Sequence, residues 1–153
     1  MHWSRKSRRL IGACWHGTGR IGPARGWATI PGVGVISATA LVASVTDPSQ
    51  LRSGREFAAS MGLVPRQNSS GGKDKLGRIS KMGDLYLRKL LVVGATSVVR
   101  RARTSDASAS NWVRSLLERK PARLATVGMA NKNAQIIWAV LARGETYRFP
   151  AAI

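Results

Sequence analysis

Acidic side chains, histidine and cysteine are all scarce in this 153-residue chain, and each shortage excludes a class of site. The single cysteine, Cys14, cannot form an internal disulfide, which fits a reducing cytoplasm. The two histidines, His2 and His16, lie close to Cys14 but lack the spacing of a zinc site. The seven acidic residues are scattered, whereas two-metal nucleases need clustered carboxylates. We therefore predict no metal site and no cofactor in this chain.

Long hydrophobic runs are also missing. The longest apolar stretch covers residues 90–99 and is too short to span a bilayer. The basic start of the chain is followed by no hydrophobic segment of signal-peptide length, so we expect no secretion signal. A membrane is therefore not an expected partner, and the cytoplasm is the expected location.

Positive charge, by contrast, is abundant. The chain has 25 lysines and arginines against 7 acidic residues, a formal net charge of +18. A hydrophobic content of 44% is enough for a core, so the length predicts one folded domain. Because the cations are spread along the chain and not held in one tail, they favour binding along a nucleic-acid backbone. On charge alone, nucleic acid is the first expected partner and an anionic membrane surface the second.

Several partial matches to phosphate-binding and hydrolase motifs are rejected because the neighbouring residues do not fit the motif. Residues 17–22 match G-x-G-x-x-G, but Pro23 follows at once and no strand precedes them. Residues 70–73 suggest a P-loop, but the residue after Lys73 is Asp74 and not serine or threonine. No G-x-S-x-G sequence is present, and neither histidine is placed to serve a hydrolytic serine. Nucleotide binding and serine-hydrolase chemistry are therefore not expected.

The pattern of the remaining chain predicts a mainly α fold. Residues 1–26 are basic and glycine-rich without helical or strand period, so we expect a disordered arm there. Residues 27–149 form the expected domain, with a helix-hairpin-helix-like element, a basic loop and a helical bundle. Ser53 and Glu56 form a capping-box pattern, and no clear alternating strand pattern appears. The expected helices lie near residues 53–61, 80–103, 111–120 and 121–144, besides one after the first turn.

The first expected site is the turn from Ile30 to Gly34. Gly32 and Gly34 allow a tight turn that exposes backbone N–H groups beside the start of the next helix. The small Ala38 would let this turn pack on that helix. A phosphate-binding hairpin and an ordinary turn before a buried helix both remain open.

The second expected site is the polar loop after Pro65, where Ser70 is the candidate nucleophile. Attack on a phosphodiester builds negative charge, which nearby cations would stabilise. A serine hydroxyl also needs a deprotonating partner, and none is evident. An unreactive phosphate-binding loop thus remains open. The expected phosphate contacts are Arg66, Lys73, Lys75, Arg78, Lys81 and Arg88.

Several blocks of the chain resemble the C-terminal domain of the insertion-sequence-110/116/902 transposases, which are bridge-RNA-guided serine recombinases. The blocks are IPGVG, REFAASMGLVPRQNSSGG, LGRISKMGDLYLRKLLVVGA and ANKNAQIIWAVLARGETY, in that order. They span roughly residues 27–147. The resemblance implies that Ser70, after GLVPR, is the nucleophile that forms a phosphoserine link with DNA in strand exchange.

The resemblance further implies a composite active site. The family's other half is an N-terminal RuvC-like domain whose four acidic residues bind a divalent metal, expected to be Mg²⁺. Residues 1–26 are too short for that domain and contain no acid. We therefore expect a truncated transposase fragment that is inactive by itself. The implied partners are DNA, guide (bridge) RNA and further copies of the chain, in a bacterial, nucleoid-associated setting.

Two alternatives to this transposase interpretation remain. A non-catalytic, basic nucleic-acid-binding module explains the charge without any role for Ser70. A ribosomal-type RNA-binding protein fits the size and charge but not the order of the blocks.

Overall fold

The computed structural model describes residues 29–45, 50–67, 76–104, 111–143 and 147. The expected arm at residues 1–26 lies outside them. Within these ranges the fold is mainly α, as the sequence predicts. The elements are α3 (Val35–Ser44), α4 (Gly54–Ser60), β1 (Pro65–Gln67), β2 (Leu76–Ile79), α5 (Leu85–Thr104), α6 (Asn111–Arg119) and α7 (Ala122–Arg143).

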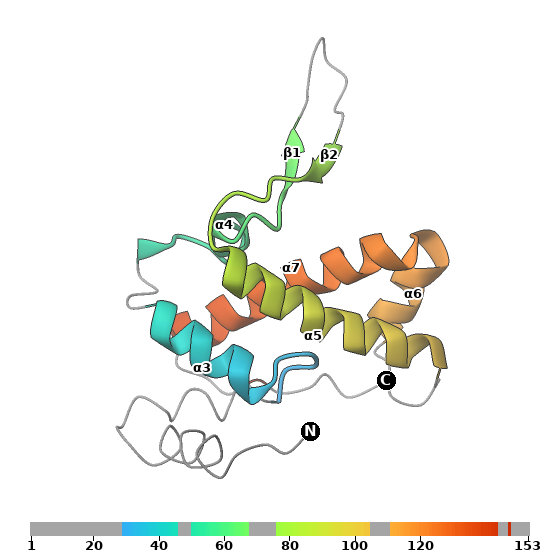
Figure 1. Ribbon diagram of the computed structural model, residues 1–153, viewed down its shortest axis with the longest axis horizontal. Coiled ribbons are helices and arrows are strands. Elements are labelled where there is room, and N and C mark those ends of the chain that lie inside the picture. The colour runs from blue at the N-terminus through green and yellow to red at the C-terminus, as the bar shows by residue number, and fades with distance from the viewer. Residues whose placement is uncertain (1–28, 46–49, 68–75, 105–110, 144–146, 148–153) are drawn as a thin grey trace, which may run out of the picture.

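The two long helices, α5 and α7, form the centre of the helical body, and the shorter helices pack around them (Figure 1). Helix α3 packs on α5, α4 packs on α7, and α6 contacts both long helices at one end. Small buried residues on α7, such as Ala130 and Ala134, let neighbouring helices approach closely. The largest fully buried side chains include Phe57, Ile30, Leu41, Met61, Leu63, Leu91 and Ile137.

Helix α7 also holds three connecting segments by side-chain hydrogen bonds. Asn131 Nδ2 donates to the Leu63 carbonyl at 3.2 Å. Asn133 Nδ2 donates to the Pro31 carbonyl at 2.9 Å, and Trp138 Nε1 donates to the Leu51 carbonyl at 3.1 Å. Buried carbonyls outside helices need such donors, so these residues fix the loops on the body.

The start of α4 confirms the predicted capping box, with one difference. The Glu56 N–H donates to Ser53 Oγ at 3.2 Å. The Glu56 carboxylate accepts from the Arg52 N–H at 2.8 Å, one residue before the usual partner. The helix ends at Met61, and Gly62 follows with φ +68°, the left-handed conformation expected after a helix.

The described residues also contain one short pair of strands, which no alternating pattern in the sequence indicated. β1 and β2 pair antiparallel, with Pro65 opposite Ile79 and Gln67 opposite Leu76. Only three and four residues long, the strands are too short for an alternating pattern to stand out. The paired segment projects from the helical body (Figure 1). We call Pro65–Gln67 with Leu76–Ile79 the ribbon.

The predicted start of the long helix, near Ser80, is wrong. Helix α5 begins at Leu85, where the Leu87 N–H donates to Asp84 Oδ1 at 2.9 Å. Lys81 and Gly83 have positive φ angles of 56° and 85°, which no helix accommodates. Asp84 is therefore the N-cap, and residues 80–84 form a tight connection from the ribbon.

Candidate nucleic-acid interface

The ribbon brings together the two ends of the predicted serine loop. Ser70, Lys73 and Lys75 themselves lie outside the described residues. β1 leads into that loop and β2 leads out of it, so the strand pairing holds its ends side by side. The ribbon is thus the described support of the segment that contains the candidate nucleophile.

Three of the predicted phosphate contacts are exposed on or beside the ribbon. Arg66 and Arg78 lie on neighbouring strands, and the irregular register places Arg66 opposite residues 77–78. Arg66 Nη2 makes one long bond of 3.4 Å to the Ser80 carbonyl, and Lys81 is exposed just after β2. No described carboxylate forms an ion pair with these cations. Like charges on adjacent strands are unfavourable unless an anion lies between them.

Arg88 differs from these exposed cations because it is buried. Only 8% of its surface is exposed. Its Nη1 donates to the Met61 carbonyl at 3.0 Å and to the Met82 carbonyl at 3.1 Å. The guanidinium thereby joins the end of α4 to the connection that precedes α5. The sequence suggested an outward phosphate contact, whereas the geometry gives Arg88 an internal role at the base of the ribbon.

Two glycines make this junction possible. A Cβ at Gly62 would lie 2.1 Å from the Met82 carbonyl oxygen and 2.8 Å from Arg88 Nη1. A Cβ at Gly83 would lie 1.7 Å from the Ser60 carbonyl oxygen. Backbone bonds from Ser80 N–H to the Val64 carbonyl and from Lys81 N–H to the Gly62 carbonyl close the junction, at 2.9 and 3.2 Å. The base of the ribbon is therefore tightly built.

The predicted glycine turn exists, but its two glycines have different surroundings. Pro31 and Gly32 are the central residues of a turn closed by the Val33 N–H donating to the Ile30 carbonyl at 2.9 Å. Gly32 has φ +83°, as a type II turn requires at this position. A Cβ on Gly94 of α5 would lie 1.7 Å from the Gly32 carbonyl oxygen. Gly32 therefore packs against α5.

Gly34, in contrast, faces open space. It is exposed, and nothing lies within 4 Å of where its Cβ would be. It is the N-cap of α3 and offers no side-chain cap, and the first intrahelical bond is Ala38 N–H to the Gly34 carbonyl. The N–H groups of the first turn therefore have no intrahelical partner. As predicted, Ala38 is fully buried beside the turn. A helix before the turn would lie outside the described residues.

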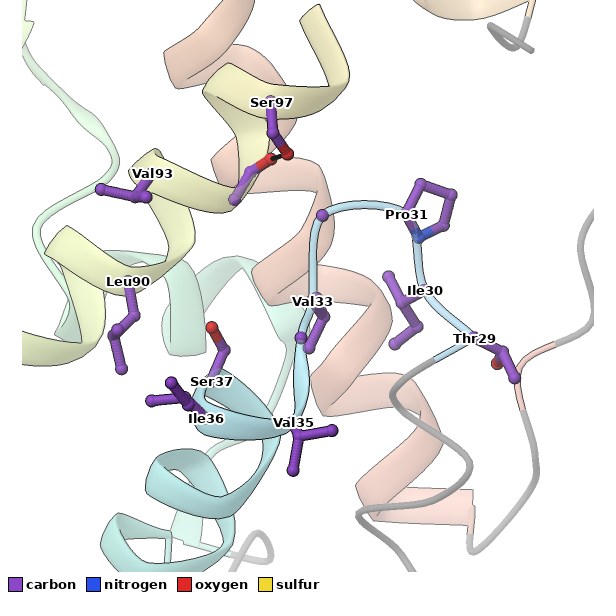
Figure 2. A pocket seen from close by; sticks show the side chains of 13 residues that line it. Thr29, Ile30, Pro31, Val33, Val35, Ile36, Ser37, Leu90, Val93 and Ser97 are labelled. Carbon is purple, nitrogen blue, oxygen red and sulfur yellow. Dashed lines mark hydrogen bonds between the residues drawn. The ribbon is translucent and has the colours of Figure 1, made fainter. Parts of the chain in front are cut away.

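A groove of about 710 Å³ runs between this turn, α3 and α5 (Figure 2). Ile36 of α3 and Leu90 and Val93 of α5 form much of its wall, and no charged side chain lines it. Figure 2 shows Ser37 between the two helices. The side chains that line the groove offer no charge to a phosphate, so a phosphate here would depend on the backbone N–H groups at the start of α3.

Within the described ranges, no three histidine, cysteine or acidic side chains come together as a metal site would require. The same ranges contain no helix long and apolar enough to cross a membrane. Their chemical character is therefore set by basic side chains and backbone donors.

Sequence reasoning missed the strands, the internal role of Arg88 and the packing of Gly94. Gly94 carried a signal, because a glycine inside an otherwise helical pattern often marks close packing. Asp84 carried another, because Gly83–Asp84 is a typical helix start. No sequence signal marked the internal role of Arg88, because buried and exposed arginines on a basic helix look alike in sequence.

Comparisons with known proteins fit this basic, helical domain. Residues 25–110 match the sequence model of the transposase IS116/IS110/IS902 family. A Pseudomonas aeruginosa protein named "Probable family 20 transposase" is 52% identical over 119 residues, which cover 78% of this chain and 35% of that protein. The transposase for insertion sequence element IS1111A of Coxiella burnetii is 48% identical over 120 residues, 78% of this chain and 33% of that protein.

A third relative, the transposase for insertion sequence element IS1328 of Yersinia enterocolitica, is 41% identical over 119 residues. The match covers 78% of this chain and 36% of that protein. The chain thus spans about a third of the length of the curated relatives it matches.

Proposed function

This chain belongs to the IS116/IS110/IS902 family of transposases, and on that premise we propose that it is a DNA-contacting domain whose ribbon supports a nucleophilic serine, Ser70. The ribbon is the observation that carries the proposal. It holds both ends of the serine loop beside Arg66, Arg78 and Lys81, which lack described ion-pair partners. Cations in this position would stabilise the charge that develops on a phosphate under attack.

The proposed reaction is a phosphoryl transfer from DNA to the serine. Ser70 Oγ forms a bond to phosphorus while the bond from phosphorus to one deoxyribose oxygen breaks. The proton lost by the serine balances the proton gained by the departing hydroxyl group. Attack by a DNA hydroxyl on the phosphoserine reverses these changes and completes strand exchange.

We propose that a divalent metal is bound by residues that only longer family members contain. No described cluster of this chain offers three ligating side chains, so we derive no step through a metal here. Guide RNA and further copies of the chain are proposed partners of the longer proteins. We expect the 153-residue chain by itself to bind DNA and to proceed at most as far as the phosphoserine link, without completing strand exchange.

The proposed contacts with DNA phosphates divide between two places. Arg66 and Arg78 lie on the ribbon and Lys81 lies just after it. Lys73 and Lys75 belong to the loop that the ribbon supports. Beside Gly34, the first turn of α3 offers backbone N–H groups, where a bound phosphate would meet the positive end of the helix. Gly32 would act indirectly, by shaping the turn.

A covalent trapping experiment tests the role of Ser70. The chain is incubated with a nicked duplex whose strand cannot re-join, and protein–DNA adducts are separated under denaturing conditions. We expect an adduct with the wild type and with Ser69→Ala, but none with Ser70→Ala. All three should bind DNA equally, because one hydroxyl adds little to a contact made by many cations.

The same experiment tests a second function, a basic DNA-binding module without chemistry, which the unpaired cations alone would explain. Equal DNA binding with no adduct from any of the three proteins would support that module. An adduct that persists in Ser70→Ala would assign the nucleophile to another residue.

A further inference from the structure

A group of cations far from the ribbon has no part in the site described above. Arg119 ends α6, Lys120 follows it, and Arg123 lies in the first turn of α7. All three side chains are exposed. We call Arg119, Lys120 and Arg123 the basic corner. It lies where α6 meets α7, at the end of the helical body to which α5 runs from the ribbon (Figure 1).

The basic corner is not neutralised by the described part of the protein. Glu118 is the nearest acidic residue in sequence, and no ion pair joins it to these cations. Arg119 Nε donates to the Ser115 carbonyl at 3.1 Å, which holds its side chain along α6. Its Nη groups make no bond to described residues and remain available to an external anion.

The position of Arg123 is unfavourable for the free protein. Arg123 lies in the first turn of a 22-residue helix, the positive end of its dipole, and no acidic residue occupies that turn. Arg119 and Lys120 lie at the C-terminal end of α6, as Arg100, Arg101 and Arg103 lie near that of α5, and cations stabilise a helix there. The helix dipole thus explains these other cations but not Arg123. Residues that conflict with local stability often serve function.

We propose that the basic corner is a second nucleic-acid-binding surface, which takes the phosphodiester backbone at a distance from the ribbon. The inference rests on the proposed function only in that the chain binds nucleic acid at all. A phosphate backbone fits because it offers a row of anions to exposed cations without requiring a pocket. Several backbone phosphates would counter both the mutual repulsion of the cations and the helix dipole.

The length of α5 sets the separation of the two surfaces. Its 20 residues span about 30 Å at the usual rise of an α-helix. The rise of a duplex is about 3.4 Å per base pair, so roughly nine base pairs would reach from the ribbon to the basic corner. A short duplex could contact only one of the surfaces at a time.

The test compares three sets of charge-neutralising substitutions in the 153-residue chain. The first set is Arg119→Gln, Lys120→Gln and Arg123→Gln at the basic corner. The second is Arg66→Gln and Arg78→Gln on the ribbon. The control set removes three exposed cations elsewhere: Arg52→Gln, Arg55→Gln and Arg143→Gln. Fluorescence anisotropy then measures affinity for a DNA duplex and an RNA duplex, each of about 20 base pairs, over a range of salt.

The expected result is a smaller salt dependence for the corner set. Three lost phosphate contacts should lower the slope of log K against log salt by about 2.7 on duplex DNA, and the control set should lower it by less than 1. The duplex whose slope falls more in the corner set, DNA or RNA, is the one that occupies the surface. The melting temperature of the corner set should stay close to that of the wild type, because the favourable charges removed at the end of α6 offset the unfavourable charge removed at the start of α7.

Two contrary results are distinguishable. Equal slopes for the corner and control sets overturn the second surface, and they leave the proposed function intact if the ribbon set still weakens binding. A wild type that binds neither duplex overturns the proposed function together with this inference. A corner effect without a ribbon effect would support the second surface and move the main DNA contact away from the ribbon.

Discussion

At the scale of single residues, the base of the ribbon depends on one buried cation. Arg88 has no described acidic partner, and its Nη1 bonds two carbonyls that come from opposite sides of the ribbon. A buried charge needs such compensation, and one carbonyl oxygen at the end of α4 and one in the connection before α5 provide it. The side chain thereby holds both ends of the ribbon on the body.

We predict that Arg88→Met lowers the free energy of unfolding by about 1–3 kcal/mol, because the Met61 and Met82 carbonyls lose their donor. The free energy of unfolding of Arg88→Lys should lie between those of the wild type and Arg88→Met, because an ammonium cannot reproduce the bonds of the planar guanidinium. Urea denaturation measures the loss. The matched control is Lys89→Met, whose side chain is exposed and whose loss should change little. Equal stability of both methionine variants would refute the internal role of Arg88.

At the scale of elements, the helices were predictable and the ribbon was not. Ser53, Glu56 and Gly62 mark the limits of α4 by local chemistry, and they do so correctly in the structure. The ribbon is stabilised by pairing and by the junction around Arg88, which are long-range features. No run of residues in Pro65–Gln67 or Leu76–Ile79 shows a strand period, so sequence alone could not reveal it.

The sequence likewise predicted the glycine turn but not the different surroundings of its two glycines. Its two glycines were given equal roles, and only their neighbours in space separate them. Gly32 contacts Gly94, which lies 62 residues later in the chain, whereas nothing lies within 4 Å of where a Cβ on Gly34 would be. The location of Ser70, Lys73 and Lys75 stays a prediction, because these residues lie outside the described ranges.

This difference predicts opposite effects of two alanine substitutions. Gly94→Ala should destabilise the fold by roughly 1–3 kcal/mol, because its methyl group would overlap the Gly32 carbonyl. Gly34→Ala should fold with a loss below about 1 kcal/mol, yet weaken DNA binding by placing a methyl group before the first turn of α3. Thermal denaturation and anisotropy measure the two effects. Unchanged DNA binding by folded Gly34→Ala would remove this turn from the proposed interface.

At the scale of the whole molecule, the main feature is an excess of positive charge. A net charge of +18 on 153 residues repels itself, and no described ion pair offsets it. Composition alone predicted the class of partner, and the structure adds that the exposed cations occupy separate regions. Composition could not reveal this separation, because it depends on where α5 and α7 begin and end.

We therefore predict that salt stabilises the free protein while weakening its complexes. Raising sodium chloride from about 10 mM to about 0.1 M shortens the screening length from roughly 30 Å to roughly 10 Å and should raise the melting temperature. A neutral osmolyte should be used as a control for general solvent effects. A melting temperature that falls over this range of salt would show that attractive charge pairs, and not repulsion, govern stability.

The hydrogen bond between Asn133 and the Pro31 carbonyl joins residues 102 positions apart, and this separation has a consequence for synthesis. The glycine turn leaves the ribosome early, but its partners Gly94 and Asn133 emerge much later. Contacts so distant in sequence form late in folding. A nascent chain that ends before Asn133 would therefore lack the finished turn, so the proposed phosphate contact at the start of α3 would form only after about half of α7 has been synthesised.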